Sequence, residues 1–330
     1  MKRKIINGIC RAGTLLSTET LIRRSKKKNI FLLYHLVADD TPLHIKHLYR
    51  PRTRKEFSDD IDFLSRHFNF ISTAELANEK SSKGKCNIHL SFDDGLRECY
   101  DTIRPILLQK GIPAVFFVNP AFIDNHCMFH CHKASLLKEA YSIRKTDLCN
   151  ETGAIIPGKE FLKTITSAIP HPEGYYENIA GQLGVDFYTY LQEHRPYLRL
   201  QQLKKMKDEG FEFGGHTLTH PHLSILPAAE QFAEISGSLQ WLNENGIADK
   251  KYFAFPFHDI GIRQAIFLKM KETGVAASFG TSGMKEDMIE THHHRSSFED
   301  SDKKAPVILK QQLFKYILQR LVGQNKIIRH

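Results

Sequence analysis

Two adjacent carboxylates are the first residues in this sequence whose type and spacing suit chemistry. Residues 91–95 (SFDDG) place Asp93 and Asp94 directly after a short apolar segment. Neighbouring side chains at the end of a strand point in different directions, so one carboxylate can hold a cation while the other stays free to accept a proton. A ligand-free Asp-Asp-Gly turn is the alternative, because these residues also favour tight turns.

A pair of histidines supplies further metal ligands. His216 and His220 are four residues apart, and Gly214 and Gly215 before them let the backbone approach a ligand closely. If the segment forms one helical turn, both imidazoles lie on one face and can share a metal ion. Histidines at this spacing are often purely structural. The carboxylates at 93–94 favour a metal site, because they supply the ligand that the histidine pair lacks.

Strands and helices are expected to alternate around these motifs. The apolar patterns predict strands at 29–37, 87–92, 113–118, 211–215, 252–256 and 275–280. They predict helices at 56–68, 97–110, 200–209, 228–245, 262–273 and 306–321. This alternation is typical of a parallel α/β fold, in which active residues lie at the carboxyl ends of the strands. The polar, irregular stretch 126–199 breaks the alternation and indicates an insertion.

Four segments carry motifs that occur together in known proteins: 34–37 (YHLV), 91–95 (SFDDG), 216–220 (HTLTH) and 253–257 (FAFPF). In this order they resemble the polysaccharide deacetylase (NodB-homology, carbohydrate esterase 4) family. The first and last segments most resemble the branch that contains poly-N-acetylglucosamine deacetylases. The resemblance covers about residues 29–298 and implies a distorted (β/α) barrel with a divalent metal at its mouth.

The resemblance also implies roles for individual residues. Asp93 corresponds to the catalytic base. Asp94, His216 and His220 correspond to the ligands of one divalent cation, for which Zn²⁺ is the first choice and Co²⁺ or Ni²⁺ are alternatives. Such a cation polarises the acetyl carbonyl and lowers the pKa of a water molecule toward ~7.

Three further residues are expected at the substrate. The backbone N–H of Phe257, after Pro256, is placed to hold the oxyanion of the reaction. His35, in the upstream Tyr-His motif, is expected at the floor of the site. A buried His35 that is merely hydrogen-bonded is the alternative.

The chain also departs from the family pattern. Many members have an arginine that orients the base where this chain has Ala254. Arg295 is our candidate to replace it, because a guanidinium fork can orient a carboxylate. The general acid for the leaving amine stays open between His258 and residues 292–294 (HHH), of which we take His294. A solvated loop is the alternative interpretation of the three-histidine run.

A stretch rich in cysteine and histidine lies at the start of the expected insertion. Residues 126–132 (HCMFHCH) contain several potential zinc ligands, but no second ligand pair with suitable spacing follows. We interpret the stretch as a polar border of the active cleft rather than as a structural zinc site.

The composition restricts the partners. The 330 residues carry a formal net charge of +9, which favours anionic partners. No aromatic-basic motif or helix-turn-helix pattern accompanies this charge, so we expect no nucleic-acid partner. The six cysteines are scattered, as is typical of reduced thiols in the cytosol.

The N-terminal residues 1–28 form a basic, amphipathic segment ahead of the expected catalytic domain at 29–330. Nine bases interrupt its apolar residues, so we expect no cleaved signal and no transmembrane helix. The pattern suits a segment held at the anionic inner face of a membrane, and we expect the protein to be cytoplasmic. The alternative is a helix that packs on its own domain.

We therefore expect a hydrolase of carbon–nitrogen bonds other than peptide bonds. Its reaction is the metal-dependent deacetylation of N-acetylated sugars in a polysaccharide or a glycan precursor. One alternative is an amide hydrolase that acts on a non-sugar substrate. Another is a glycan-binding relative without activity, although a binder has no use for the free carboxylate of Asp93 beside a metal.

Overall fold

A computed structural model describes residues 13–77, 85–150, 152–165, 171–172, 174–299 and 301–330. At its centre lies a sheet with the strand order β11-β9-β8-β7-β4-β3-β1-β12, and β2 pairs with β3 at one side. All of these pairings are parallel. The strands are β1 (Asn29–Tyr34), β2 (Asn69–Ile71), β3 (Asn87–Phe92), β4 (Val115–Val118), β7 (Glu212–Gly215), β8 (Lys251–Ala254), β9 (Val275–Gly280), β11 (His292–His294) and β12 (Ser296–Ser297).

The two ends of this sheet belong to one stretch of chain. Only Arg295 separates β11, which pairs with β9, from β12, which pairs with β1. The sheet therefore curls into a nearly closed parallel barrel, and Arg295 lies at the seam. The predicted distorted (β/α) barrel is confirmed.

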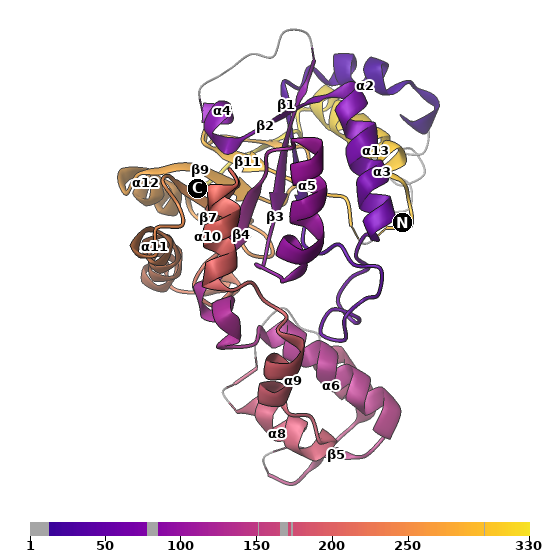
Figure 1. The fold of residues 1–330 in the computed structure, drawn as a ribbon, viewed down its shortest axis with the longest axis vertical. Coiled ribbons are helices and arrows are strands. Elements are labelled where there is room, and N and C mark those ends of the chain that lie inside the picture. The colour runs from indigo at the N-terminus through magenta and orange to yellow at the C-terminus, as the bar shows by residue number, and fades with distance from the viewer. Residues whose placement is uncertain (1–12, 78–84, 151, 166–170, 173, 300) are drawn as a thin grey trace.

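Helices surround the barrel and bury its outer surface (Figure 1). They are α2 (Thr18–Ser25), α3 (Arg54–His67), α4 (Thr73–Ala77), α5 (Arg104–Lys110), α10 (Leu200–Asp208), α11 (Ala228–Glu244), α12 (Gln264–Glu272) and α13 (Ala305–Leu321). Short 3-10 or π turns occur at η1 (Gly13–Leu15), η2 (Cys99–Ile103), η3 (Pro120–Asn125) and η4 (Leu223–Ile225). The predicted helix 97–110 corresponds to η2 followed by α5, which ends at Gly111 in the left-handed region (φ 63°).

Local sequence signals explain where the elements begin and how deeply they are buried. Thr53 and Glu56 form a reciprocal capping box that starts α3. All six residues of β3 are buried, as expected for a parallel strand covered on both faces. Aromatic side chains fill the barrel, including Phe117, Tyr252 and Phe279. This rigid interior holds the strand ends that carry the motifs.

The stretch between β4 and α10 forms a small lobe beside the barrel (Figure 1). Its elements are α6 (His130–Arg144), α7 (Gly158–Thr164), α8 (Tyr175–Leu183), α9 (Phe187–His194) and the antiparallel pair β5 (Leu148–Cys149) and β6 (Ile155–Ile156). A separate apolar cluster, which includes Leu137, Phe161 and Ile179, stabilises the lobe. The insertion expected at 126–199 falls on these elements, and its boundaries stay a prediction.

The described part of the basic N-terminal segment packs against α13. Leu21 is fully buried, and the Arg320 guanidinium donates a hydrogen bond to the carbonyl of Ser25 at 2.6 Å. Residues 1–12, with the remaining bases of the segment, lie outside the described residues. Among the described helices, none is both long and apolar enough to cross a membrane.

Candidate active site

The two carboxylates lie at the carboxyl end of β3, at the mouth of the barrel. The Asp93 N–H donates a hydrogen bond to the carbonyl of Tyr34 at 3.1 Å, which continues the pairing of β3 with β1. The chain then turns sharply, because Asp94 and Gly95 both adopt left-handed backbone angles (φ 71° and 62°). The turn directs the two acidic side chains to different partners, as the sequence predicted for adjacent carboxylates.

The two histidines follow β7, two strands away from β3. Residues 216–220 do not form the helical turn that their spacing allowed, because Thr217 and His220 both have positive φ (68° and 60°). An irregular loop nevertheless brings the two imidazole rings within 4.9 Å, centroid to centroid. The loop is held by Asn119, whose amide donates to the carbonyl of Thr217 at 3.2 Å.

Asp94, His216 and His220 form a compact, buried set of donors. The Nε2 atoms of His216 and His220 lie 3.4 and 3.2 Å from Oδ1 of Asp94, and all three ligand atoms lie within 4.8 Å of one another. A carboxylate with two imidazoles is a donor set that suits a catalytic first-row metal, since it leaves positions open for water and substrate.

The hydrogen bonds of this set fit a cation. His216 Nδ1 donates to the carbonyl of Ala254 at 2.8 Å, which orients the ring so that Nε2, on the side of Asp94, can bind a metal ion. Oδ1 of Asp94, which both imidazoles approach, is also buried without a hydrogen-bond partner among the described residues. Buried polar atoms are rarely left unsatisfied.

Arg295 holds Asp93. Its Nη1 and Nη2 atoms donate to Oδ1 and Oδ2 of Asp93 at 2.7 and 2.8 Å, and Nη1 also donates to Oγ of Ser91 at 3.1 Å. Both side chains of the pair are buried. The fork orients the carboxylate from the seam of the barrel, so the structure brings together the two residues that we paired from the sequence.

His35 lies beside this pair, at the end of β1, with a partner that the sequence analysis missed. Its Nδ1 lies 2.7 Å from Oε2 of Glu299, and its backbone N–H donates to Oε1 of the same carboxylate at 2.7 Å. Burial alone would lower the pKa of His35, but the Glu299 charge outweighs this and raises that pKa to about 9. His35 is therefore a protonated imidazole at neutral pH. No spacing rule relates residues 264 positions apart, so only the fold could show this pair.

A cavity of about 590 Å³ opens over these residues. Its floor contains the predicted residues at the strand ends: His35, Asp93, Asp94, His216, His220 and Phe257. The loop at Leu48 and Tyr49 forms one wall, and Phe129, Cys131, His132 and Lys138 of the inserted lobe contribute another. Residues 126–132 thus border the cleft, as expected. No group of three metal ligands was found among the described residues of this stretch.

Phe257 takes a strained position at the cavity floor. Its φ is 53°, which is uncommon for an aromatic residue and marks a backbone held by its surroundings. Thr281 Oγ1 fixes the segment by donating to the carbonyl of Phe257 at 2.7 Å. No described residue accepts a hydrogen bond from its N–H. That donor remains available for a substrate oxygen, directly after Pro256.

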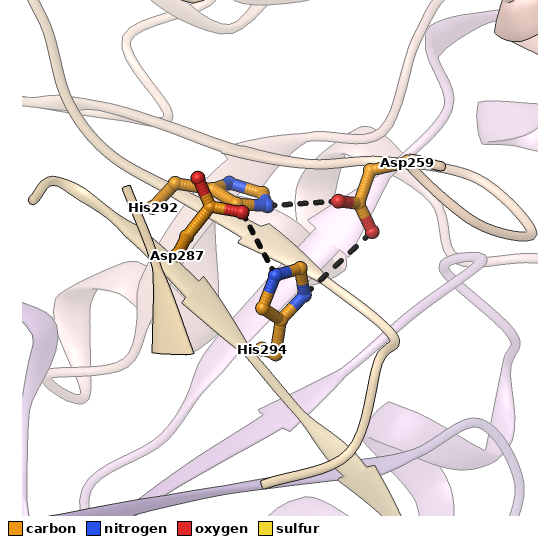
Figure 2. Close-up of side chains that lie close together, drawn as sticks. All are labelled: Asp259, Asp287, His292 and His294. Atoms are coloured by element: carbon orange, nitrogen blue, oxygen red, sulfur yellow. Dashed lines mark hydrogen bonds and ion pairs between the residues drawn. The ribbon is translucent and has the colours of Figure 1, made fainter. Parts of the chain in front are cut away.

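The structure corrects the assignment of His294 as general acid. His294 is buried on β11 and does not line the cavity. Figure 2 shows it between two carboxylates, with Nε2 3.0 Å from Asp287 and Nδ1 3.7 Å from Asp259. Residues 292–294 are thus a strand rather than a solvated loop. His258 lies outside the cavity lining as well, with its Nε2 3.2 Å from Nε2 of His222.

Comparisons with solved structures agree with the barrel. The structure of the Streptococcus pyogenes deacetylase PplD in complex with acetate is similar over 87% of this chain and 98% of that chain, with a TM-score of 0.57 and 15% identity. The structure of IcaB from Ammonifex degensii is similar over 87% of this chain and 97% of that chain, with a TM-score of 0.55 and 16% identity. At these identities the likeness concerns the fold. No curated protein sequence matches.

The sequence itself identifies the family. The sequence profile of the polysaccharide deacetylase family matches residues 80–277, which is more than half of the chain. That range contains both carboxylates, both histidines and the segment at Phe257. Members of this family are hydrolases that cleave carbon–nitrogen bonds other than peptide bonds. This chain belongs to the polysaccharide deacetylase family and acts on N-acetylated glycans.

Proposed function

We propose that this site releases acetate from an N-acetylated sugar, with one divalent cation held by Asp94, His216 and His220. The observation that carries the proposal is the separation of roles within two adjacent residues. Asp94 faces two imidazoles, while Asp93 is held by Arg295 at the same cavity. When bound, the cation would supply a Lewis acid that polarises the acetyl carbonyl and makes water more acidic.

The chain's own residues then account for the proton transfers. Asp93 accepts a proton from water as the water oxygen bonds to the carbonyl carbon. The N–H of Phe257 is placed to stabilise the negative charge that develops on the carbonyl oxygen. The protonated imidazole of His35 gives its proton to the nitrogen as the carbon–nitrogen bond breaks. The products are acetate and a free amine.

Zinc is the cation that we propose for the site. Two imidazoles and one carboxylate with open positions are a common catalytic zinc set, and Co²⁺ or Ni²⁺ could use the same donors. Changing His216 to Ala should remove most bound metal and nearly all activity. Elemental analysis of the purified protein tests this, and full metal occupancy in His216→Ala would rule the assignment out.

Acetate release across a panel of N-acetylated substrates tests the function. We expect release from N-acetylglucosamine oligosaccharides and loss of release when a chelator removes the metal. Release from simple N-acetyl amides but from no sugar would favour the alternative amide hydrolase. Glycan binding without any release, at full metal occupancy, would favour a binding protein.

We further propose that the protein works in the cytoplasm, at the inner face of a membrane. The proposal is supported by the basic residues of the N-terminal segment. Arg23, Arg24, Lys26 and Lys28 are exposed around α2, and Leu15 before it is 88% exposed. Each base near an anionic surface contributes on the order of 1 kcal/mol to binding. A glycan precursor carried by a lipid would be the substrate at such a surface.

A further inference from the structure

Four buried titratable side chains lie behind the active site in what we call the Asp259 cluster: Asp259, Asp287, His292 and His294 (Figure 2). They come from the loop after β8, from β10 (Glu286–Asp287) and from β11. His292 Nε2 lies 3.2 Å from Asp259, and His294 Nε2 lies 3.0 Å from Asp287. All four side chains are fully buried.

Arg329 closes the cluster from the segment after β13 (Lys326–Ile327), which pairs with β10. Its Nε donates to both carboxylate oxygens of Asp287 at 3.0 Å, and its Nη1 donates to the backbone carbonyl of Asp259 at 2.9 Å. A further ion pair joins the Nη2 atom to the Asp259 carboxylate. One guanidinium thus binds both acids.

The cluster differs from the metal site in having its partners already in place. No side-chain atom of its four members or of Arg329 is a buried polar atom without a hydrogen bond, whereas Asp94 and His220 each have one. Burial lowers the pKa of His292 to about 4, so this imidazole is neutral at pH 7. The cluster needs no ligand, because Arg329 supplies the positive charge that a metal would supply.

Two short connections lead from the cluster to the active site. The Asp259 carboxylate accepts a hydrogen bond from the N–H of Thr281, and the hydroxyl of Thr281 holds the carbonyl of Phe257. The second connection is Gly280, which pairs with His294 and whose carbonyl accepts the N–H of Arg295 at 2.9 Å. A Cβ on Gly280 would lie 2.2 Å from Oδ1 of Asp259, so the strand touches the cluster directly.

We propose that the Asp259 cluster, closed by Arg329, is a positioning device for the deacetylase site. The cluster holds β11 through His292 and His294, and it holds the backbone at Phe257 through Thr281. It thereby sets the position of Arg295 against Asp93. The five side chains are positioning residues, since none of them lines the cavity. The inference rests on the proposed function only in the role that it gives to Arg295.

Arg329→Met tests the device, with Lys326→Met as the matched control. Lys326 is exposed on the same segment, so the control removes the same charge without touching the cluster. We expect kcat to fall about tenfold or more in Arg329→Met with KM nearly unchanged, because small displacements of catalytic groups are costly. The control should behave as wild type. Arg329→Lys, which keeps the charge but loses the fork, should be intermediate and serves if the Met variant does not fold.

A double-mutant cycle separates positioning from general destabilisation. If Arg329 acts through Arg295, its substitution should cost much less in an Arg295→Lys background than in the wild type. If the losses of kcat caused by the two substitutions simply multiply in the double mutant, Arg329 does not act through Arg295 and the proposal is overturned. One equivalent of metal bound to the His216→Ala variant would also overturn the proposal, if the wild type binds two. The Asp259 cluster would then be a metal site.

Hydrogen exchange provides a readout that needs no activity. In folded Arg329→Met or Arg329→Lys, the amides of residues 280–283 and 295–297 should exchange faster, while those of β3 and β4 should not. Faster exchange confined to residues 324–330 would contradict the proposal. If the wild type releases no acetate from any substrate, the proposed function fails, and hydrogen exchange still decides whether the cluster positions Arg295.

Discussion

At the scale of single residues, two charged pairs hold the base and the acid of the proposed reaction. Arg295 binds Asp93 through both carboxylate oxygens, which fixes the direction in which that carboxylate can accept a proton. Glu299 binds His35 and keeps its imidazole protonated, with a pKa raised to about 9. The base and the acid of the proposed reaction are thus each held by a partner of opposite charge.

The Glu299 pair predicts the alkaline limit of activity. A general acid works while it is protonated, so kcat should fall as the pH rises through the pKa of His35. Glu299→Gln removes the negative charge that raises this pKa, and the fall should therefore move to lower pH. The pH dependence of kcat measures the shift. Glu209→Gln is the control, because Glu209 pairs with Arg104 and neither residue lines the cavity. Identical alkaline limbs in wild type and Glu299→Gln would show that His35 is not the acid.

At the scale of elements, the inserted helix α6 forms a wall of the substrate cavity. Lys138 of α6 lines the cavity, and no described residue pairs with it. Lys133, on the same helix, instead pairs with Glu177 at 2.6 Å and does not line the cavity. We expect Lys138→Met to raise KM several-fold with little change in kcat, because a lysine in the cavity wall is placed to bind substrate away from the reacting atoms. Equal KM values for Lys138→Met and the control Lys133→Met would exclude the contact.

Strand β9 makes a second prediction at this scale. Gly280→Ala places a methyl group against the Asp259 cluster, and overpacking of this kind costs roughly 1–3 kcal/mol of folding free energy. Gly181 lies in helix α8, and a Cβ there would meet nothing within 4 Å. Gly181→Ala should therefore be neutral or stabilising by up to about 1 kcal/mol. Thermal unfolding compares the two variants. Similar melting temperatures would contradict the prediction, because β9 would then accommodate the methyl group without loss of stability.

The same strands show what the sequence could predict and what it could not. The metal ligands and Asp93 follow strand ends that apolar patterns reveal, so local sequence was sufficient to group them. His294 was assigned wrongly because adjacent residues of a strand face opposite sides. Arg295 points into the barrel, as does His293, which stacks on Phe31 with ring centroids 4.5 Å apart. His294 faces outward to the cluster.

Two other functional residues could not be predicted from the sequence, because only the fold brings them close to their partners. Glu299 and Arg329 are ordinary charged residues in the sequence, and their partners lie 264 and 70 positions away. The parallel α/β fold was predictable, because strands and helices alternate along most of the chain, and the family resemblance implied the barrel. The closure of the barrel at Arg295 could not be predicted, since it depends on the register of β11 with β9 and of β12 with β1.

At the scale of the whole molecule, the net charge of +9 bears on where the protein works. Replacing Arg23, Arg24, Lys26 and Lys28 by Gln should weaken binding to anionic vesicles at low salt, because these bases are exposed around α2. The control replaces four exposed lysines elsewhere, at 204, 205, 250 and 271, and so has the same net charge. Cosedimentation separates the two. If both variants and the wild type stay in the supernatant, the proposed membrane contact is wrong.

The central claim is that Asp93 accepts the proton while Asp94, His216 and His220 hold the metal. Acetate release by Asp93→Asn, measured together with its metal content, tests this claim most directly. A carboxamide cannot accept the proton, but it leaves the three ligands untouched. The account predicts a folded protein that keeps one metal per chain and loses most of its activity, on the order of 10²–10⁴-fold. Near-normal release of acetate by Asp93→Asn at full metal occupancy would contradict it.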